Sequence, residues 1–119
     1  MRTHKDLEVW KVSIDFVTAI YRATQSFPKE EIYGLTSQIR RCVVSIPSNI
    51  AEGAVKNSDK DFARFLSIAL GSSSELDTQL IIAKKLEFID ETTFKELTIQ
   101  NDSIGKMLNG LIRYLRNKN

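Results

Sequence analysis

Residues 33–53 read YGLTSQIRRCVVSIPSNIAEG, and their hydrophobic spacing decides the fold class. Apolar side chains recur every three or four residues, the period of an amphipathic α-helix, at Leu35, Ile39, Val43, Ile46 and Ile50. Pro47 interrupts the pattern, and a proline inside a helix costs roughly 3 kcal/mol. Because the apolar stripe keeps its phase on both sides of Pro47, we predict one kinked helix rather than two. Gly53 is expected to end this helix in a left-handed conformation.

The segment from Lys5 to Thr24 predicts a helix with two neighbouring apolar stripes. A bundle helix needs only one buried face, and we assign that face to the first stripe, which comprises Leu7, Trp10, Ile14, Val17 and Tyr21. The second stripe comprises Val9, Val12, Phe16 and Ile20. It would leave a broad apolar band that indicates a subunit interface. The alternative is a helix set deep in a monomeric core.

A third helix is predicted over residues 59–86, with Ser58 as its cap. Its core positions are expected at Phe62, Phe65, Leu66, Ala69, Ser73, Leu76, Leu80 and Ala83. Gly71 weakens a helix by roughly 1 kcal/mol relative to alanine. We therefore expect another helix to pack closely against Gly71, near Pro47.

A fourth helix is predicted from Asp90 or Thr93 to about Arg116. Its core-facing residues alternate three and four apart and form a coiled-coil-like seam, which comprises Phe94, Leu97, Asn101, Ile104, Leu108, Leu111 and Leu115. Asn101 is the one polar residue of this seam, and such a residue typically fixes register or partner. The chain shows no strand pattern and only short connections between its helices. These features predict an all-α fold, an antiparallel up-down four-helix bundle with a Pro-kinked second helix, as a single domain over residues 1–119.

The composition is that of an ordinary soluble globular chain. Of its 119 residues, 42% are hydrophobic and 27% are charged, and the net charge is +2. This balance permits contact with nucleic acid on one face, but a typical nucleic-acid-binding domain is far more basic. No apolar run reaches the length of a membrane helix, and the polar start does not resemble a signal peptide. We expect a cytoplasmic protein that does not bind a membrane.

The candidate chemical groups favour structural roles. His4 is the only histidine and Cys42 the only cysteine, so we expect no metal site and no cofactor. Cys42 borders the apolar stripe, where a free cysteine usually packs as a small hydrophobe. Glu52 is interpreted as structural, for example as the partner of an arginine on a neighbouring helix. A catalytic role would need a second acid or base, and the sequence places none beside it. The chain lacks a phosphate loop and a nucleophile signature, and we predict that it is not an enzyme.

The basic residues have two interpretations. Cations at the end of the fourth helix and at the end of the third complement the helix dipoles. Arg40 and Arg41 lie mid-helix, where no dipole favours them, and Lys56, Lys60 and Arg64 follow across the next connection. These five residues are our candidate phosphate contacts for RNA. The aromatic side chains fall on apolar stripes and do not indicate base stacking.

Two long motifs resemble a known family. YGLTSQIRR with SIPSNIAEG, followed by FARFLSIALGSSSELDTQL and preceded by DLEVWK, is similar to the proteins encoded in intervening sequences of 23S ribosomal RNA genes. The resemblance spans about Asp6 to Tyr114. It implies an antiparallel four-helix bundle that assembles into a homopentameric ring and has no established enzymatic activity. A distant branch of related proteins binds RNA and a reverse transcriptase, which makes RNA binding a hypothesis for this chain.

The sequence therefore predicts a non-catalytic homo-oligomer, with a pentamer preferred from the resemblance, that binds RNA or a ribonucleoprotein. The alternative is a structural or protein-interaction scaffold without a nucleic-acid partner. In that case Arg40 and Arg41 would form intersubunit ion pairs with acids such as Glu52 or Glu75.

Overall fold

The computed structural model describes residues 3–118, which form four long α-helices and two short 3-10 turns. In chain order these elements are η1 (His4–Asp6), α1 (Glu8–Thr24), η2 (Lys29–Glu31), α2 (Leu35–Ala54), α3 (Asp59–Lys85) and α4 (Glu91–Asn117). The described residues contain no strand, which confirms the all-α prediction. None of their helices is both long and apolar enough to cross a membrane.

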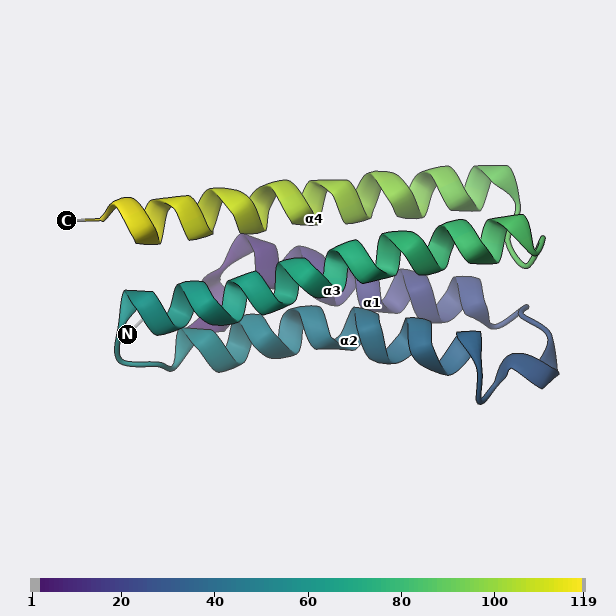
Figure 1. Cartoon of the computed structure of the whole chain (residues 1–119), viewed down its shortest axis with the longest axis horizontal. Helices are drawn as coiled ribbons and strands as arrows, with labels where there is room; N and C mark the ends of the chain where they lie inside the picture. The colour runs from purple at the N-terminus through teal and green to yellow at the C-terminus, as the bar shows by residue number, and fades with distance from the viewer. Residues whose placement is uncertain (1–2, 119) are drawn as a thin grey trace.

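Successive helices run back and forth along the long axis of the molecule, so that the start of α1 and the end of α4 lie at the same end of the bundle (Figure 1). α2 packs against α1 and α3, and α4 packs against α3 and α1. Each helix thus has two neighbours around one shared core. Capping side chains mark the start of the last two helices: Ser58 caps α3 by accepting from the Asp61 N–H at 3.1 Å, and Asp90 caps α4 by accepting from the Thr93 N–H at 2.8 Å.

The structure buries the second apolar stripe of α1 more deeply than the first. The core contains Val9, Phe16 and Ile20 from the stripe that we had assigned to a subunit interface. Leu7, Trp10 and Val17 of the first stripe are only partly buried against this core. Ile14 and Tyr21, from the predicted core stripe, are 38% and 39% exposed. The reason is packing: α1 contacts both α2 and α4, and the stripe that points between these two helices is the buried one. The predicted start is also shifted, because the chain is extended at Leu7 between η1 and α1.

α2 continues through Pro47 as one helix, and its predicted bend remains a prediction. Gly53 does not end the helix in a left-handed conformation, because α2 extends to Ala54 and no described glycine has a positive φ. Instead, Gly53 is a site of close helix contact. A Cβ at this position would lie 2.7 Å from the Phe65 Cβ and 3.2 Å from the Phe62 carbonyl oxygen of α3.

The close contact predicted at Gly71 is absent. Gly71 is exposed, and a Cβ built there meets nothing within 4 Å. The other residues predicted to face the core from α3 are buried, except Phe62 and Phe65, which are half-buried. Ala63, which was not predicted, is also buried. The seam of α4 is confirmed in the same way, with Asn101 buried in it and Ile112 added to it.

Candidate nucleic-acid interface

The predicted phosphate contacts fall into two groups on the structure. Lys56, Lys60 and Arg64 lie around the α2–α3 connection and the first turns of α3. Arg40 and Arg41 lie in the second turn of α2, some fifteen residues earlier, or about 22 Å along a helix that rises 1.5 Å per residue. The fold brings the first three residues together and does not bring the two arginines to them.

The first group covers an aromatic ring at the end of the bundle. The Lys56 Nζ lies 5.2 Å and the Arg64 guanidinium 4.6 Å from the centre of the Phe65 ring. Lys56 also pairs with Glu52 one turn earlier, at 3.1 Å. Glu52 therefore pairs with a lysine of its own chain rather than with an arginine. The Lys56–Glu52 pair is solvent-exposed and contributes little stability, so Lys56 remains available to a ligand.

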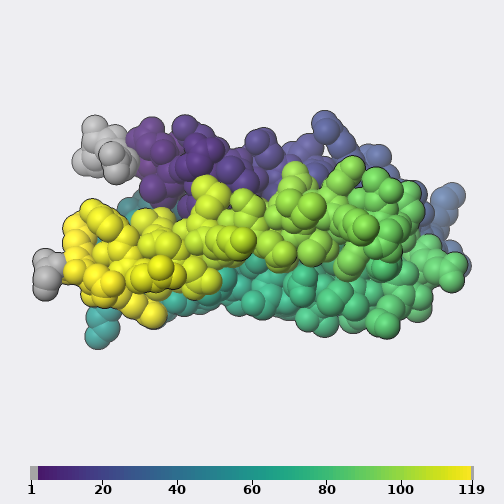
Figure 2. Space-filling model, turned by 90° about the horizontal axis from the view of Figure 1, so that it is seen from above, coloured from purple at the N-terminus to yellow at the C-terminus, as the bar shows by residue number. Residues whose placement is uncertain are grey.

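The end of α4 adds cations beside this group. A groove of about 650 Å³ runs between the start of α3 and the end of α4. It is lined by Asp59, Lys60, Asp61, Ala63, Arg64, Ser67, Leu115, Arg116 and Lys118. Figures 1 and 2 both show the yellow end of α4 beside the teal start of α3 at one end of the molecule. We call this feature the α3–α4 groove.

Arg40 is bound to the end of α1. Its Nε donates to the Thr24 Oγ1 at 2.9 Å, and its guanidinium lies 4.6 Å from the centre of the Tyr21 ring. Thr24 is the last residue of α1. The expectation that no helix dipole favours Arg40 was therefore wrong, because the cation lies at the carboxyl end of a neighbouring helix.

Arg41 points to the other side of α2. It is exposed, and it lines a hollow between α2 and α3 together with Cys42, Ser72 and Glu75. The Cys42 thiol donates to the Ser72 carbonyl oxygen at 3.1 Å. Burial, with a smaller contribution from Glu75, raises the pKa of Cys42 to about 12. The thiol is therefore protonated at neutral pH, which agrees with its predicted role in packing.

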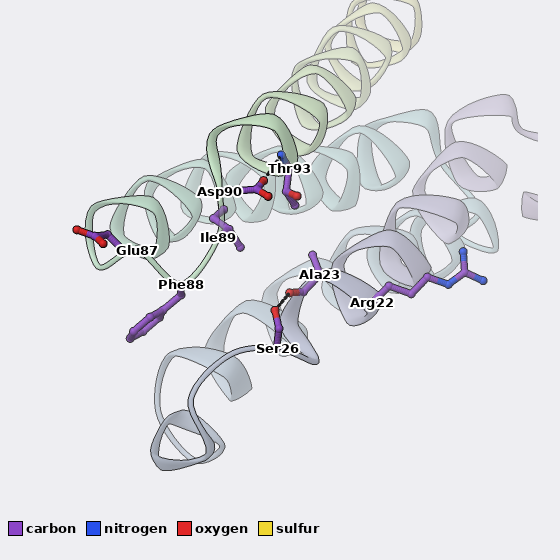
Figure 3. Close-up of a pocket in the computed structure, with 8 residues that line it drawn as sticks. All are labelled: Arg22, Ala23, Ser26, Glu87, Phe88, Ile89, Asp90 and Thr93. Carbon is purple, nitrogen blue, oxygen red and sulfur yellow. Dashed lines mark hydrogen bonds between the residues drawn. The ribbon is translucent and has the colours of Figure 1, made fainter.

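A second hollow lies where α1 ends and α4 begins (Figure 3). It is lined by Arg22, Ala23, Ser26, Glu87, Phe88, Ile89, Asp90 and Thr93. The Asp90 carboxylate already accepts the Thr93 N–H, and this bond lowers its pKa. An ionised helix cap is not available as a general acid. Among residues 3–118 no group of histidine, cysteine and acid side chains could hold a metal ion, and His4 packs edge-on against Trp10 at 5.1 Å.

The bundle and its motifs agree with one family of known proteins. The sequence profile described as 23S rRNA-intervening sequence protein matches residues 5–110. The chain belongs to this family. A crystal structure of a protein of unknown function from the S23 ribosomal protein family of Bacteroides thetaiotaomicron is similar, with 25% sequence identity and a TM-score of 0.81. The similarity covers 88% of this chain and 95% of that one. No curated protein matches the chain.

Part of the basic surface of this 23S rRNA-intervening sequence protein was not predicted. The cations at the end of the fourth helix, which include Arg116 and Lys118, were attributed to its helix dipole alone. The signal that could have identified them is topological: in an up-down bundle, the end of the fourth helix lies beside the start of the third. Lys60 and Arg64 at that start should therefore have been counted with them.

Proposed function

We propose that this intervening-sequence protein is a non-catalytic, self-associating bundle that binds RNA through the basic residues around the start of α3. The observation that carries the proposal is the gathering of Lys56, Lys60 and Arg64 from the α2–α3 connection and one helix face. Cations that are exposed at one end of a rigid scaffold bind phosphates by releasing the counterions of the nucleic acid. The modest charge of +2 per chain is multiplied in an assembly.

Self-association is supported by two exposed apolar faces. Ile14 and Tyr21 of α1 form one face with Val44, which lies one turn after the Arg40 that covers the Tyr21 ring. A second face, near the end of α3, comprises Ile82 and Leu86, which are 42% and 54% exposed.

The two faces are on different sides of the bundle, since α3 packs against α2 and α4 and not against α1. Pairing of one face with the other would be heterologous, and a heterologous contact that closes forms a ring. The preference for five copies comes from the family resemblance.

A scaffold without a nucleic-acid partner is the second candidate, and Arg40 bears on it. That candidate assigned Arg40 and Arg41 to intersubunit ion pairs. The contacts of Arg40 with Thr24 and Tyr21 give it a use within the chain instead. Arg41 lines the same hollow as Glu75 and retains the intersubunit role in this alternative.

The test is equilibrium binding of the purified protein to a structured ribosomal-type RNA and a matched DNA, titrated across salt. We expect sub-micromolar RNA binding that weakens steeply with salt and is stronger than DNA binding. The Lys56→Gln, Lys60→Gln, Arg64→Gln triple variant should lose most of it. An Arg41→Gln variant is the control, because Arg41 lies outside this group. Absence of binding near physiological salt would contradict the RNA proposal.

Mass measurement in solution tests the assembly. Ile14→Glu on α1 and Ile82→Glu on α3 should each dissociate a heterologous ring, because each charge disrupts one of its two faces. An Ile99→Glu variant is the control, as Ile99 is 68% exposed on α4 and belongs to neither face. A monomeric wild-type protein at micromolar concentration would contradict self-association and leave the RNA measurement unaffected.

A further inference from the structure

We propose that the α3–α4 groove binds the phosphate groups of a single nucleic-acid strand along its length. This inference rests on the proposed RNA binding and specifies the site and the form of the ligand. The groove has one bank from α3, carrying Lys60 and Arg64, and one from α4, carrying Arg116 and Lys118. Its floor is apolar, formed by the buried side chains of Ala63 and Leu115.

The cations on both banks are available. Among the described residues, neither Lys60 nor Arg116 has a carboxylate within 4.0 Å. The side-chain hydrogen bond of Arg116 is a long one, from its Nη2 to the Ser67 Oγ at 3.5 Å. A guanidinium with most of its donors free is suited to the two oxygens of a phosphate.

The other two cations have weak carboxylate partners. Arg64 lies 3.9 Å from the Asp61 carboxylate, and Lys118 lies 3.4 Å from that of Asp59. The side chains of both cations and of their two acids are roughly half-exposed. Surface pairs of this kind contribute about 0–1 kcal/mol. A phosphate can therefore compete for both cations, although the two acids reduce the net charge of the groove to about +2. This balance favours a ligand with several phosphates over a single anion.

The placement of the cations favours one strand. Lys60 and Arg64 belong to one helix and Arg116 and Lys118 to its neighbour, so a flexible single backbone that follows the groove can contact cations on both banks. A double helix is stiff, with a persistence length of about 50 nm, and it cannot follow the groove to contact all four. No aromatic ring lines the groove, so we expect contacts to the backbone and little dependence on base sequence.

The experiment compares the Arg116→Gln, Lys118→Gln variant with wild type. The probes are a single-stranded RNA of mixed sequence, the same strand in a duplex, and inorganic phosphate as competitor. Loss of two contacts should weaken single-strand binding about tenfold at low salt and reduce the log–log salt slope by about 1.4. Duplex binding should change less than twofold. A Lys85→Gln, Lys95→Gln variant removes the same charge at the opposite end of the bundle and should bind as wild type.

Each other outcome has a distinct meaning. If wild type binds RNA and the Arg116→Gln, Lys118→Gln variant binds it equally well, the groove is not the site and the proposed function stands. Equal losses for the strand and the duplex would overturn the single-strand assignment. Displacement of the strand by inorganic phosphate at equal concentration would show a site for one anion and contradict binding along a strand. If wild type binds no RNA, the proposed function fails and the inference fails with it.

Discussion

Ser73 of α3 and Asn101 of α4 bond to each other twice across the core. The Ser73 hydroxyl donates to the Asn101 Oδ1 at 2.8 Å, and the Asn101 Nδ2 donates to the Ser73 carbonyl oxygen at 2.9 Å. Both residues are buried, at 5% and 2% exposed. Asn101, the polar residue of the α4 seam, can make these bonds only when it lies level with Ser73. The pair therefore fixes the register of α3 against α4.

Asn101→Ala should destabilise the protein by about 2–4 kcal/mol, because it leaves the buried Ser73 hydroxyl without its acceptor and opens a small cavity. Urea unfolding monitored by circular dichroism measures the loss. Ser73→Ala combined with Asn101→Leu removes both polar groups and should recover part of it. Strictly additive effects of the Ser73→Ala and Asn101→Ala changes would contradict a paired role.

Two of the helical glycines, Gly53 and Gly71, should respond oppositely to alanine. Gly53→Ala places a Cβ 2.7 Å from that of Phe65, and such overpacking costs about 1–3 kcal/mol. Gly71→Ala enters open space and should stabilise α3 by about 0.5–1 kcal/mol. Thermal unfolding of the two variants checks both signs. Stabilisation by Gly53→Ala would show that α2 and α3 can separate at this contact.

Arg40→Ala should lower stability by about 1 kcal/mol, because the buried Thr24 hydroxyl loses a charged donor at the end of α1. Arg40→Lys should not restore it, since a lysine has no planar guanidinium to lie over Tyr21. Arg41→Ala, on the exposed side of α2, is the control and should change stability by less than 0.5 kcal/mol. The Arg40→Ala, Arg41→Ala double variant should still self-associate, and its dissociation to monomers would support the scaffold alternative.

The start of α4 should lose stability in acid. The Thr93 N–H lowers the pKa of Asp90, and Lys84 lowers that of Glu91. A carboxyl with a lowered folded-state pKa stabilises the fold above its unfolded pKa, near 4, and this contribution disappears as the pH falls through the folded value. Asp90→Asn keeps the capping acceptor without the titration. Its melting temperature should fall less than that of wild type between pH 5 and pH 3.

Cys42 should be inert in the folded protein. Its pKa of about 12 leaves a negligible thiolate fraction at neutral pH, and its side chain is buried. A thiol reagent such as 5,5′-dithiobis(2-nitrobenzoate) should therefore react at the rate of unfolding and rapidly only in denaturant. Fast labelling under native conditions would indicate an accessible thiolate.

The sequence alone determined the helices and the family. Hydrophobic spacing predicted the four helices and the polar seam position of Asn101, because periodicity is a local property. The capping pattern predicted Ser58 for α3 and left Asp90 and Thr93 as alternatives for the start of α4, where the structure selects Asp90. The same spacing could not choose between the two stripes of α1, which are equally apolar, and it misassigned Gly53 and Gly71, because a glycine's packing role depends on which helix faces it.

The tertiary structure alone decided how distant residues combine. It placed Arg40 at the end of α1, on the buried Thr24 hydroxyl, and Arg41 on the opposite side of the same helix. It joined Arg116 and Lys118 of α4 to Lys60 and Arg64 of α3 in one groove. These residues lie about fifty positions apart in the chain. Their proximity follows from antiparallel packing around a shared core, which sets the neighbours of each surface side chain only once the helices are assembled.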